Sequence, residues 1–219
     1  MSKRAKALII VAAALFFAMG GVVIYFRIYY RLVRITTGSM ANTIVPGDSV
    51  LCGWNVREVK RGDIVMFKLP TDPKVMYLKR VIGLPGETIQ VRSHRVFVNG
   101  NELPEERALI RLTGGPQDPQ SPVVKVEPKP HDARYRVFYD FDRYSIGDDF
   151  EIDRGLKYGS SEPYEIPSGH YFLLGDSRDN SEDSRHWGTV PRELIVGKAI
   201  MIFDSKAKGN EGRLFKPLE

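Results

Sequence analysis

Residues 75–87 read VMYLKRVIGLPGE, an apolar run closed by a turn rich in glycine and proline. The first eight of them, residues 75–82, have the length and the β-branched and aromatic content of a buried strand. Lys79 and Arg80 interrupt the run, and because side chains alternate along a strand they point to opposite faces. The pattern leaves open which cation is buried, and both could instead lie at a strand edge with their heads in solvent.

The two cations differ in how readily they lose a proton. Arginine stays protonated in proteins, whereas burial disfavours the charged form of lysine and lowers its pKa. If one of them is a catalytic base, it is therefore Lys79. A nucleophile for such a base is offered by Ser39 in the sequence Thr37-Gly38-Ser39-Met40, although a Gly-Ser pair alone is typical of a turn.

Short apolar runs separated by turn residues lie on both sides of residues 75–82. This spacing indicates a mostly β fold rather than repeated βαβ units. The final residues, 204–219, are expected to form a solvated tail. The expected strands are residues 49–53, 63–69, 75–82, 88–98 with a break, 170–174 and 194–203.

Residues 102–167 differ from their surroundings in composition. They hold many prolines and charges, with aromatic residues interleaved between position 135 and position 144. We interpret them as an insertion or small lobe, a β-ribbon that packs its aromatic side chains. The alternative, a nucleic-acid surface, is disfavoured by the aspartates in the same stretch. The expected organisation is a cytoplasmic N-terminus at 1–6, a transmembrane anchor at 7–26, a catalytic core at 27–101 and 168–219, and the insertion at 102–167.

Residues 7–26 carry no charge. A helix of this length spans roughly 30 Å, the thickness of a bilayer core. A cleaved secretory signal is the alternative, but the run is longer than the usual apolar region of such signals, so we expect a retained anchor. Three basic residues lie on each side of it, so the positive-inside rule does not orient it. The flanking residues are Lys3, Arg4 and Lys6 before the run and Arg27, Arg31 and Arg34 after it.

Composition narrows the classes of function. The net charge is +5, but it falls to +2 without the three basic residues ahead of the apolar run, so the balance does not favour a nucleic-acid partner. A single cysteine, Cys52, excludes an internal disulfide. The four histidines lack metal-ligand spacing, and we expect neither metal nor cofactor. A Ser-His-Asp triad around His170 or His186 remains open, without a nucleophile-elbow motif to support it.

Residues 175–185 read GDSRDNSEDSR and are dense in hydrogen-bonding side chains. They do not have the ligand spacing of a calcium loop, because Arg178 occupies a ligand position and no glycine follows at the sixth. A loop braced by Asp–Arg pairs fits better.

Four segments together resemble the conserved boxes of the bacterial type I signal peptidases, in the order of that family. They are residues 37–40, 62–67, 77–87 and 175–185. The resemblance runs from the apolar segment to about Phe203, and residues 102–167 fall where the family varies. It implies a β-rich catalytic domain behind one transmembrane helix, and a serine endopeptidase without cofactor that removes signal peptides after an Ala-X-Ala site.

The resemblance also implies a role for individual residues. Ser39 would be the nucleophile and Lys79 its neutral general base. The Ser39 N–H and the Thr37 hydroxyl would form the oxyanion hole. The remaining matches are Ser181, Asp183 and Arg185 as supporting residues, and Ile35, Ile44 and Leu78 as the lining of shallow substrate pockets. Asn42 stands where the family usually has proline, so the loop after Ser39 and the shape of the pocket are expected to differ from the family's.

The family further implies a place and partners. Its members hold the N-terminus in the cytoplasm and the catalytic domain on the outer face of the inner membrane, so the expected partners are signal peptides of preproteins and the lipid bilayer. A self-cleaving Ser–Lys repressor would need a helix-turn-helix domain where residues 7–26 stand. A specialised or inactive homologue that acts as a binding protein is the alternative, although an inactive one would be expected to lose Ser39 or Lys79.

Overall fold

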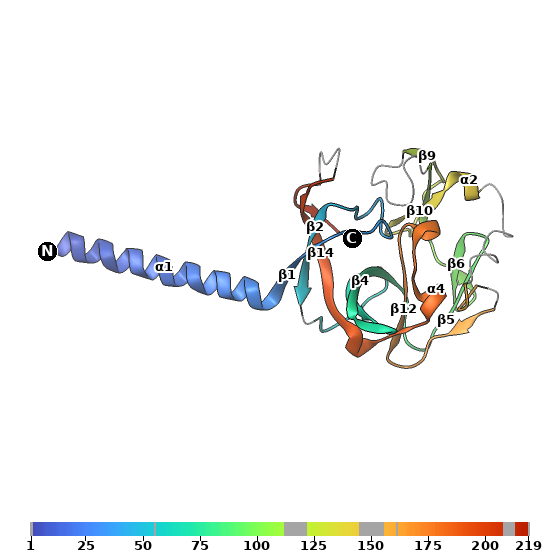
Figure 1. Cartoon of the computed structure of the whole chain (residues 1–219), viewed down its shortest axis with the longest axis horizontal. Helices are drawn as coiled ribbons and strands as arrows, with labels where there is room; N and C mark the ends of the chain where they lie inside the picture. The colour runs from blue at the N-terminus through green and yellow to red at the C-terminus, as the bar shows by residue number, and fades with distance from the viewer. Residues whose placement is uncertain are drawn as a thin grey trace.

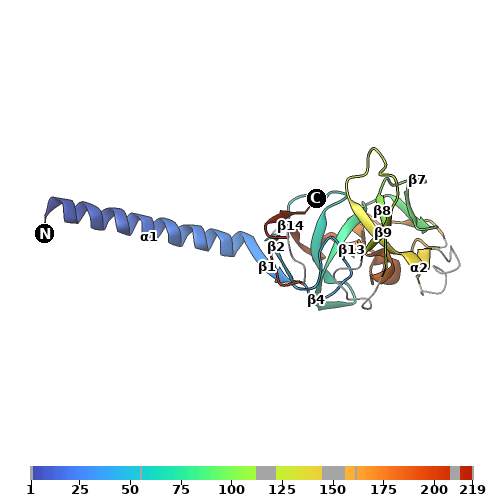
Figure 2. The same ribbon diagram turned by 90° about the horizontal axis from the view of Figure 1, so that it is seen from above.

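The computed structural model describes residues 2–54, 56–111, 122–144, 156–160, 162–207 and 213–218. A long helix, α1 (Lys3–Tyr29), leads directly into strand β1 (Tyr30–Arg34). Figures 1 and 2 show α1 projecting away from the β-rich body of the molecule as a separate rod. Arg4–Tyr29 is long and apolar enough to cross a membrane, with a mean hydropathy of 2.7 in its most apolar window, and none of that window is buried.

Within the described residues the strands form three sheets. The largest has eight strands in the order β1-β2-β14-β3-β4-β12-β13, with β15 paired to β14. Its bounds are β2 (Asp48–Trp54), β3 (Ile64–Leu69), β4 (Asp72–Gly83), β12 (His170–Leu174), β13 (Val190–Pro191), β14 (Ile195–Ser205) and β15 (Lys216–Pro217). The mostly β fold is therefore confirmed, and the expected strands match β2, β3, β4, β12 and β14 to within three residues.

The second sheet has four strands in the order β11-β5-β6-β7, and three of them, β5 to β7, follow β4 in the chain. Asn99 and Gly100 turn β6 into β7 with positive φ angles of 51° and 79°, as a tight hairpin turn requires. The strands are β5 (Thr88–Arg92), β6 (Arg95–Val98), β7 (Asn101–Glu102) and β11 (Tyr164–Glu165).

The third sheet lies within residues 102–167 and has the order β10-β8-β9. Its outer strand β9 is exposed, whereas buried side chains of β8 and β10 pack with the aromatic residues predicted to do so, Tyr135, Phe141 and Tyr144 among them. The expected domain boundaries stay a prediction. The elements are β8 (Glu106–Ile110), β9 (Val123–Val126), β10 (Arg136–Asp140) and α2 (Phe141–Tyr144).

The expected solvated tail, residues 204–219, is only partly so among its described residues: residues 214–217 are exposed, but some of the stretch is held by the large sheet. β14 continues to Ser205, and β15 pairs with it at Met201 and Ile202. Arg213 binds the buried carboxylate of Asp48 at 2.5 Å. β15 can pair with β14 at Met201 and Ile202 because β3 pairs with β14 only as far as Lys198. This pairing depends on the folded sheet and cannot be read from local composition.

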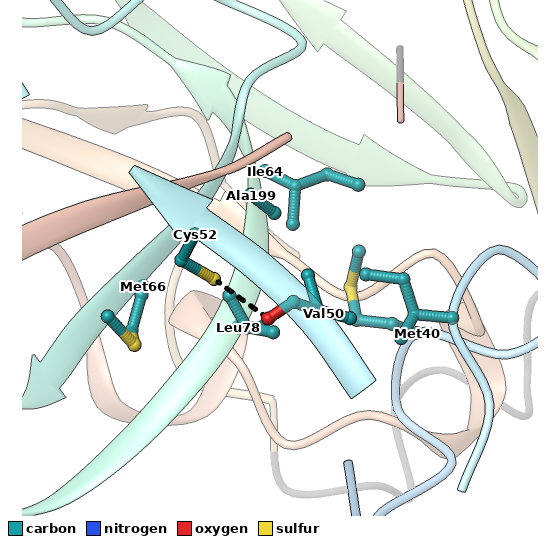
Figure 3. Close-up of a cluster of buried hydrophobic side chains, with 8 residues drawn as sticks. Met40, Val50, Cys52, Ile64, Met66, Leu78 and Ala199 are labelled. Carbon is teal, nitrogen blue, oxygen red and sulfur yellow. Dashed lines mark hydrogen bonds between the residues drawn. The ribbon is translucent and has the colours of Figure 1, made fainter. Parts of the chain in front are cut away.

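The core is organised around β4, which is buried on both faces from Leu78 onward. Leu78 joins one cluster of buried side chains, shown in Figure 3, in which Met40, Met66 and Cys52 also take part. Val81 joins a second cluster. Both cations of β4 are buried as well, Lys79 and Arg80 each being 1% exposed, so the strand-edge alternative is wrong.

Candidate active site

Ser39 lies in the loop between β1 and β2. The Ala41 N–H donates to the Gly38 carbonyl at 2.9 Å, which makes a tight turn around it. Met40 buries its side chain in the core beside β4 and anchors the turn. The Ser39 carbonyl accepts a hydrogen bond from the Ser177 N–H at 3.2 Å. Two segments far apart in sequence therefore fix the Ser39 backbone, while its side chain stays partly accessible.

Lys79 reaches Ser39 from β4. The Lys79 Nζ atom lies 2.5 Å from the Ser39 Oγ atom, within hydrogen-bonding distance. The amine also lies 5.3 Å from the centre of the Tyr77 ring. A buried amine in contact with a hydroxyl is the arrangement that general-base activation of a serine requires.

The surroundings lower the pKa of Lys79 to about 8, and the main cause is burial, which disfavours the charged amine. The carboxylate of Asp183 acts in the opposite direction, and the guanidinium of Arg185 lowers the pKa further. Near neutral pH a usable fraction of Lys79 is therefore unprotonated, which an exposed lysine would not allow.

Asp183 and Arg185 form a buried ion pair beneath the site. The Arg185 guanidinium donates to both oxygens of Asp183, each at 2.8 Å. Burial alone would raise the pKa of Asp183, but Arg185 and the Gly175 N–H hold it well below its usual range. The carboxylate also caps the short helix α4 (Ser184–Trp187). The Asp–Arg bracing that was expected of residues 175–185 is thus present.

Arg80 points away from Ser39, to the other face of β4. Its guanidinium donates to both carboxylate oxygens of Asp176, at 2.8 and 2.7 Å, and to the Gly62 carbonyl at 2.7 Å. The Thr43 hydroxyl donates to the same carboxylate at 2.7 Å. This pair ties β4 to the loop after Ser39 and to the polar loop after β12.

A third buried pair links the polar loop to residues 102–167. Arg178, in the short helix η1 (Arg178–Asn180), donates to Glu105 at 2.8 and 2.5 Å. Both side chains are fully buried. Sequence reasoning missed Glu105, because nothing in the sequence next to β8 indicates that this acid is buried.

Ser181 lies close to Ser39 but is not joined to Lys79 here. A side chain built on Gly175 would run into the Ser181 hydroxyl and the Ser39 carbonyl, so these three residues touch one another. The Ser181 Oγ atom is buried and has no hydrogen-bond partner in the described part of the chain. The bond to the Lys79 amine expected from the resemblance is therefore not formed in this structure.

An apolar groove of about 300 Å³ opens beside Ser39. It contains the three residues predicted to line a substrate pocket, Ile35, Ile44 and Leu78. Thr37 is exposed at its rim. Sequence reasoning missed further lining residues, of which Met76 shares a strand face with Leu78 and could have been found from that alternation. Those residues are Val33, Met40, Met66, Val75, Met76 and Tyr77.

The chain matches the family model described as signal peptidase, peptidase S26, over residues 6–204. Signal peptidase I of Pseudomonas aeruginosa is 33% identical over 198 residues, which cover 78% of this chain and 64% of that protein. Signal peptidase I of Aquifex aeolicus is 31% identical over 210 residues, covering 84% of this chain and 79% of that protein. This chain belongs to the signal peptidase family, peptidase S26.

The chain spans less than two thirds of the length of the Pseudomonas aeruginosa relative. A crystal structure of a signal peptidase I from Enterococcus faecalis covers 64% of this chain at 22% identity, with a TM-score of 0.35.

Proposed function

We propose that this chain is a membrane-anchored serine endopeptidase that removes N-terminal signal peptides from exported preproteins. The observation that carries the proposal is the 2.5 Å contact between the buried Lys79 amine and the Ser39 hydroxyl. Family membership supports the same activity. The apolar helix α1 supports a membrane location. The proposed orientation, with the N-terminus in the cytoplasm and the catalytic domain on the outer face, rests on the resemblance to the family and not on the helix.

The proposed reaction runs through an acyl-enzyme. Lys79 takes the proton of the Ser39 hydroxyl as Oγ attacks the scissile carbonyl carbon, and the carbonyl oxygen becomes an oxyanion. The Ser39 N–H and the Thr37 hydroxyl stabilise that oxyanion. Lys79 then returns the proton to the amide nitrogen as the C–N bond breaks. The neutral amine next takes a proton from a water, whose oxygen attacks the ester carbonyl. As the C–Oγ bond breaks, Lys79 gives that proton to the Ser39 Oγ atom, which restores the hydroxyl and the neutral amine.

The supporting residues act on Lys79. The ion pair of Asp183 and Arg185 lies near the Lys79 amine and influences its charge. When Ser39 is acylated, the Ser181 hydroxyl forms a hydrogen bond with the Lys79 amine. The Ser181 hydroxyl is buried without a hydrogen-bond partner in the described part of the chain, which costs free energy. A role for this hydroxyl in a later step of the reaction would explain why the site keeps it.

The apolar groove would bind the residues before the cut. Its lining by Ile35, Ile44 and Leu78 and its modest volume suit small side chains, which supports cleavage after an Ala-X-Ala sequence.

The test is cleavage of an Ala-X-Ala preprotein by the full chain in detergent. Ser39→Ala and Lys79→Ala should each lower the rate at least about 10⁴-fold, because nucleophile and base act as a unit. Ser168→Ala and Lys68→Ala are matched controls on exposed positions and should cleave normally. Full activity in Lys79→Ala would rule out the dyad.

A further inference from the structure

A second hollow opens on the other side of Ser39 from the apolar groove. It is a polar recess of about 250 Å³. Ser39, Thr37 and Tyr77 line both hollows, so the two hollows adjoin at these residues. Lys79 lines the recess and does not line the groove. The remaining lining residues of the recess are Gly38, Asn180 and Glu182.

The position of Lys79 assigns the recess to the leaving group. In the proposed reaction Lys79 returns its proton to the nitrogen of the scissile bond, so that nitrogen must lie on the Lys79 side of Ser39. An extended peptide that places its preceding residues in the apolar groove then continues into the recess. The first residues of the released protein therefore pass the walls formed by Asn180 and Glu182.

Glu182 gives this recess its charge. Its side chain is exposed, and within the described residues no hydrogen bond or ion pair occupies its carboxylate. This sets it apart from Asp176, Asp183 and Glu105, whose carboxylates are buried against arginines. Its negative charge is felt at the reacting centre, where it acts to raise the pKa of Lys79.

We propose that Glu182 is a specificity-determining residue, whose carboxylate favours substrates with a positively charged side chain in the first two positions after the scissile bond. A carboxylate that already had a partner could not discriminate in this way. An accessible one attracts a cation and repels an anion at short range. This inference depends on the proposed function, because it takes the recess to hold the leaving group of the peptidase reaction.

The size of the preference follows from the exposure of Glu182. Exposed ion pairs are weak and are screened by salt within about 10 Å at 0.1 M. We expect kcat/KM for a substrate with lysine at both positions to exceed that for glutamate by about three- to fivefold at low salt. The ratio should shrink as the salt concentration rises.

The experiment compares three preproteins that differ only at those two positions, carrying lysine, glutamine or glutamate. The full chain is assayed in zwitterionic detergent, so that no charged lipid biases the substrates. Each protein is described by its own lysine-to-glutamate ratio of kcat/KM, so a general change in rate cancels. Glu182→Gln should bring the ratio close to one, and Glu182→Lys should invert it. Glu193→Gln is the matched control, an exposed acid on η2 (Arg192–Leu194) that lines neither hollow, and should keep the wild-type ratio.

The outcomes separate this inference from the proposed function. If the wild type cleaves the glutamine substrate and Ser39→Ala does not, the proposed function stands. A lysine-to-glutamate ratio near one in the wild type, or an unchanged ratio in Glu182→Gln and Glu182→Lys, would then overturn the role of Glu182 alone. If the wild type cleaves none of the three, the proposed function fails and this inference fails with it.

Discussion

The two residues at the centre of the site differ in how they are held. Ser39 is fixed through its backbone by a turn and by the Ser177 N–H, whereas Lys79 is fixed by its strand and by burial. Burial also sets the chemistry of Lys79, because it lowers the pKa of the amine to about 8. In the proposed reaction the Ser39 hydroxyl needs no lowered pKa of its own, because Lys79 removes its proton as Oγ attacks.

The pKa of Lys79 predicts the acid limb of the pH–rate profile. Above about pH 8 the amine is mostly neutral, and below it the amine is mostly protonated. Only the neutral amine can accept the Ser39 proton as the proposed reaction requires. We expect kcat/KM to fall about tenfold for each pH unit well below that value. The measurement is kcat/KM on a neutral peptide between pH 5 and pH 9. A rate that stays flat over this range would contradict an amine base.

The close packing around Gly175 predicts that a substitution there lowers both the activity and the stability of the protein. A Cβ atom at this position would lie 2.6 Å from the Ser181 Cβ and would run into the Ser39 carbonyl. Gly175→Ala should therefore displace both residues and lower kcat about a hundredfold, since small misplacements of reacting groups are costly. The free energy of unfolding should fall by about 1–3 kcal/mol, as for other overpacked sites.

The control for this substitution is Gly53→Ala on β2. A Cβ there would meet the end of the flexible Ile200 side chain at 3.3 Å, away from Ser39. It should leave kcat unchanged. Equal losses of kcat in the two variants would show that the close approach at Gly175 is not what positions the site.

At the scale of elements, the polar loop after β12 is tied to residues 102–167 by the pair of Arg178 and Glu105. We predict that Glu105→Leu, which removes the carboxylate that balances the buried Arg178 charge, destabilises the fold by about 3–5 kcal/mol. Denaturant unfolding measures it. The double variant with Arg178→Met should recover most of the loss, because a buried pair can be replaced by apolar side chains of similar size.

The neighbouring residue supplies the control. Glu106 pairs with Arg136 at the surface, where the Arg136 side chain is 44% exposed. Glu106→Gln should change the free energy of unfolding by no more than about 1 kcal/mol. If Glu105→Leu were as mild as Glu106→Gln, Arg178 would have to find another partner, and the link between the two parts of the molecule would be weak.

The elements also show what sequence could and could not predict. β3 and β12 match the expected strands to within one residue, because their apolar runs are bounded by turn residues. β15 was missed because it is two residues long and exists only as a partner of β14. The short helices η1 and α4 could not be told from a loop in the sequence, because neither is long enough to show a helical period.

The sequence indicated which residue types could carry the chemistry of the site, but not which residues come into contact there. Lysine could be preferred to arginine as a base from their protonation behaviour alone. That Lys79 meets Ser39, 40 residues earlier, came from resemblance and not from local pattern. Glu105 lies 73 residues from Arg178 and no periodicity links them, so this pair could not be foreseen.

At the scale of the whole molecule, α1 stands clear of the body, and its most apolar stretch is not buried against the β domain (Figure 1). Nothing in its packing requires a particular apolar sequence. We therefore predict that replacing residues 7–26 by an unrelated leucine–alanine helix of the same length keeps both membrane association and cleavage of a membrane-inserted preprotein. Flotation of vesicles and preprotein cleavage measure the two properties on the same sample.

The matched control is the same helix with two central lysines. Each lysine at the centre of a span costs about 2.5–3.5 kcal/mol on insertion scales, so this chain should leave the membrane fraction. It should then lose its rate on the membrane-inserted preprotein while keeping its rate on a soluble Ala-X-Ala peptide, because the Ser39–Lys79 site lies wholly in the β-rich body. A leucine–alanine chain that floats with the vesicles yet cleaves neither substrate would instead assign α1 a sequence-specific role in the site.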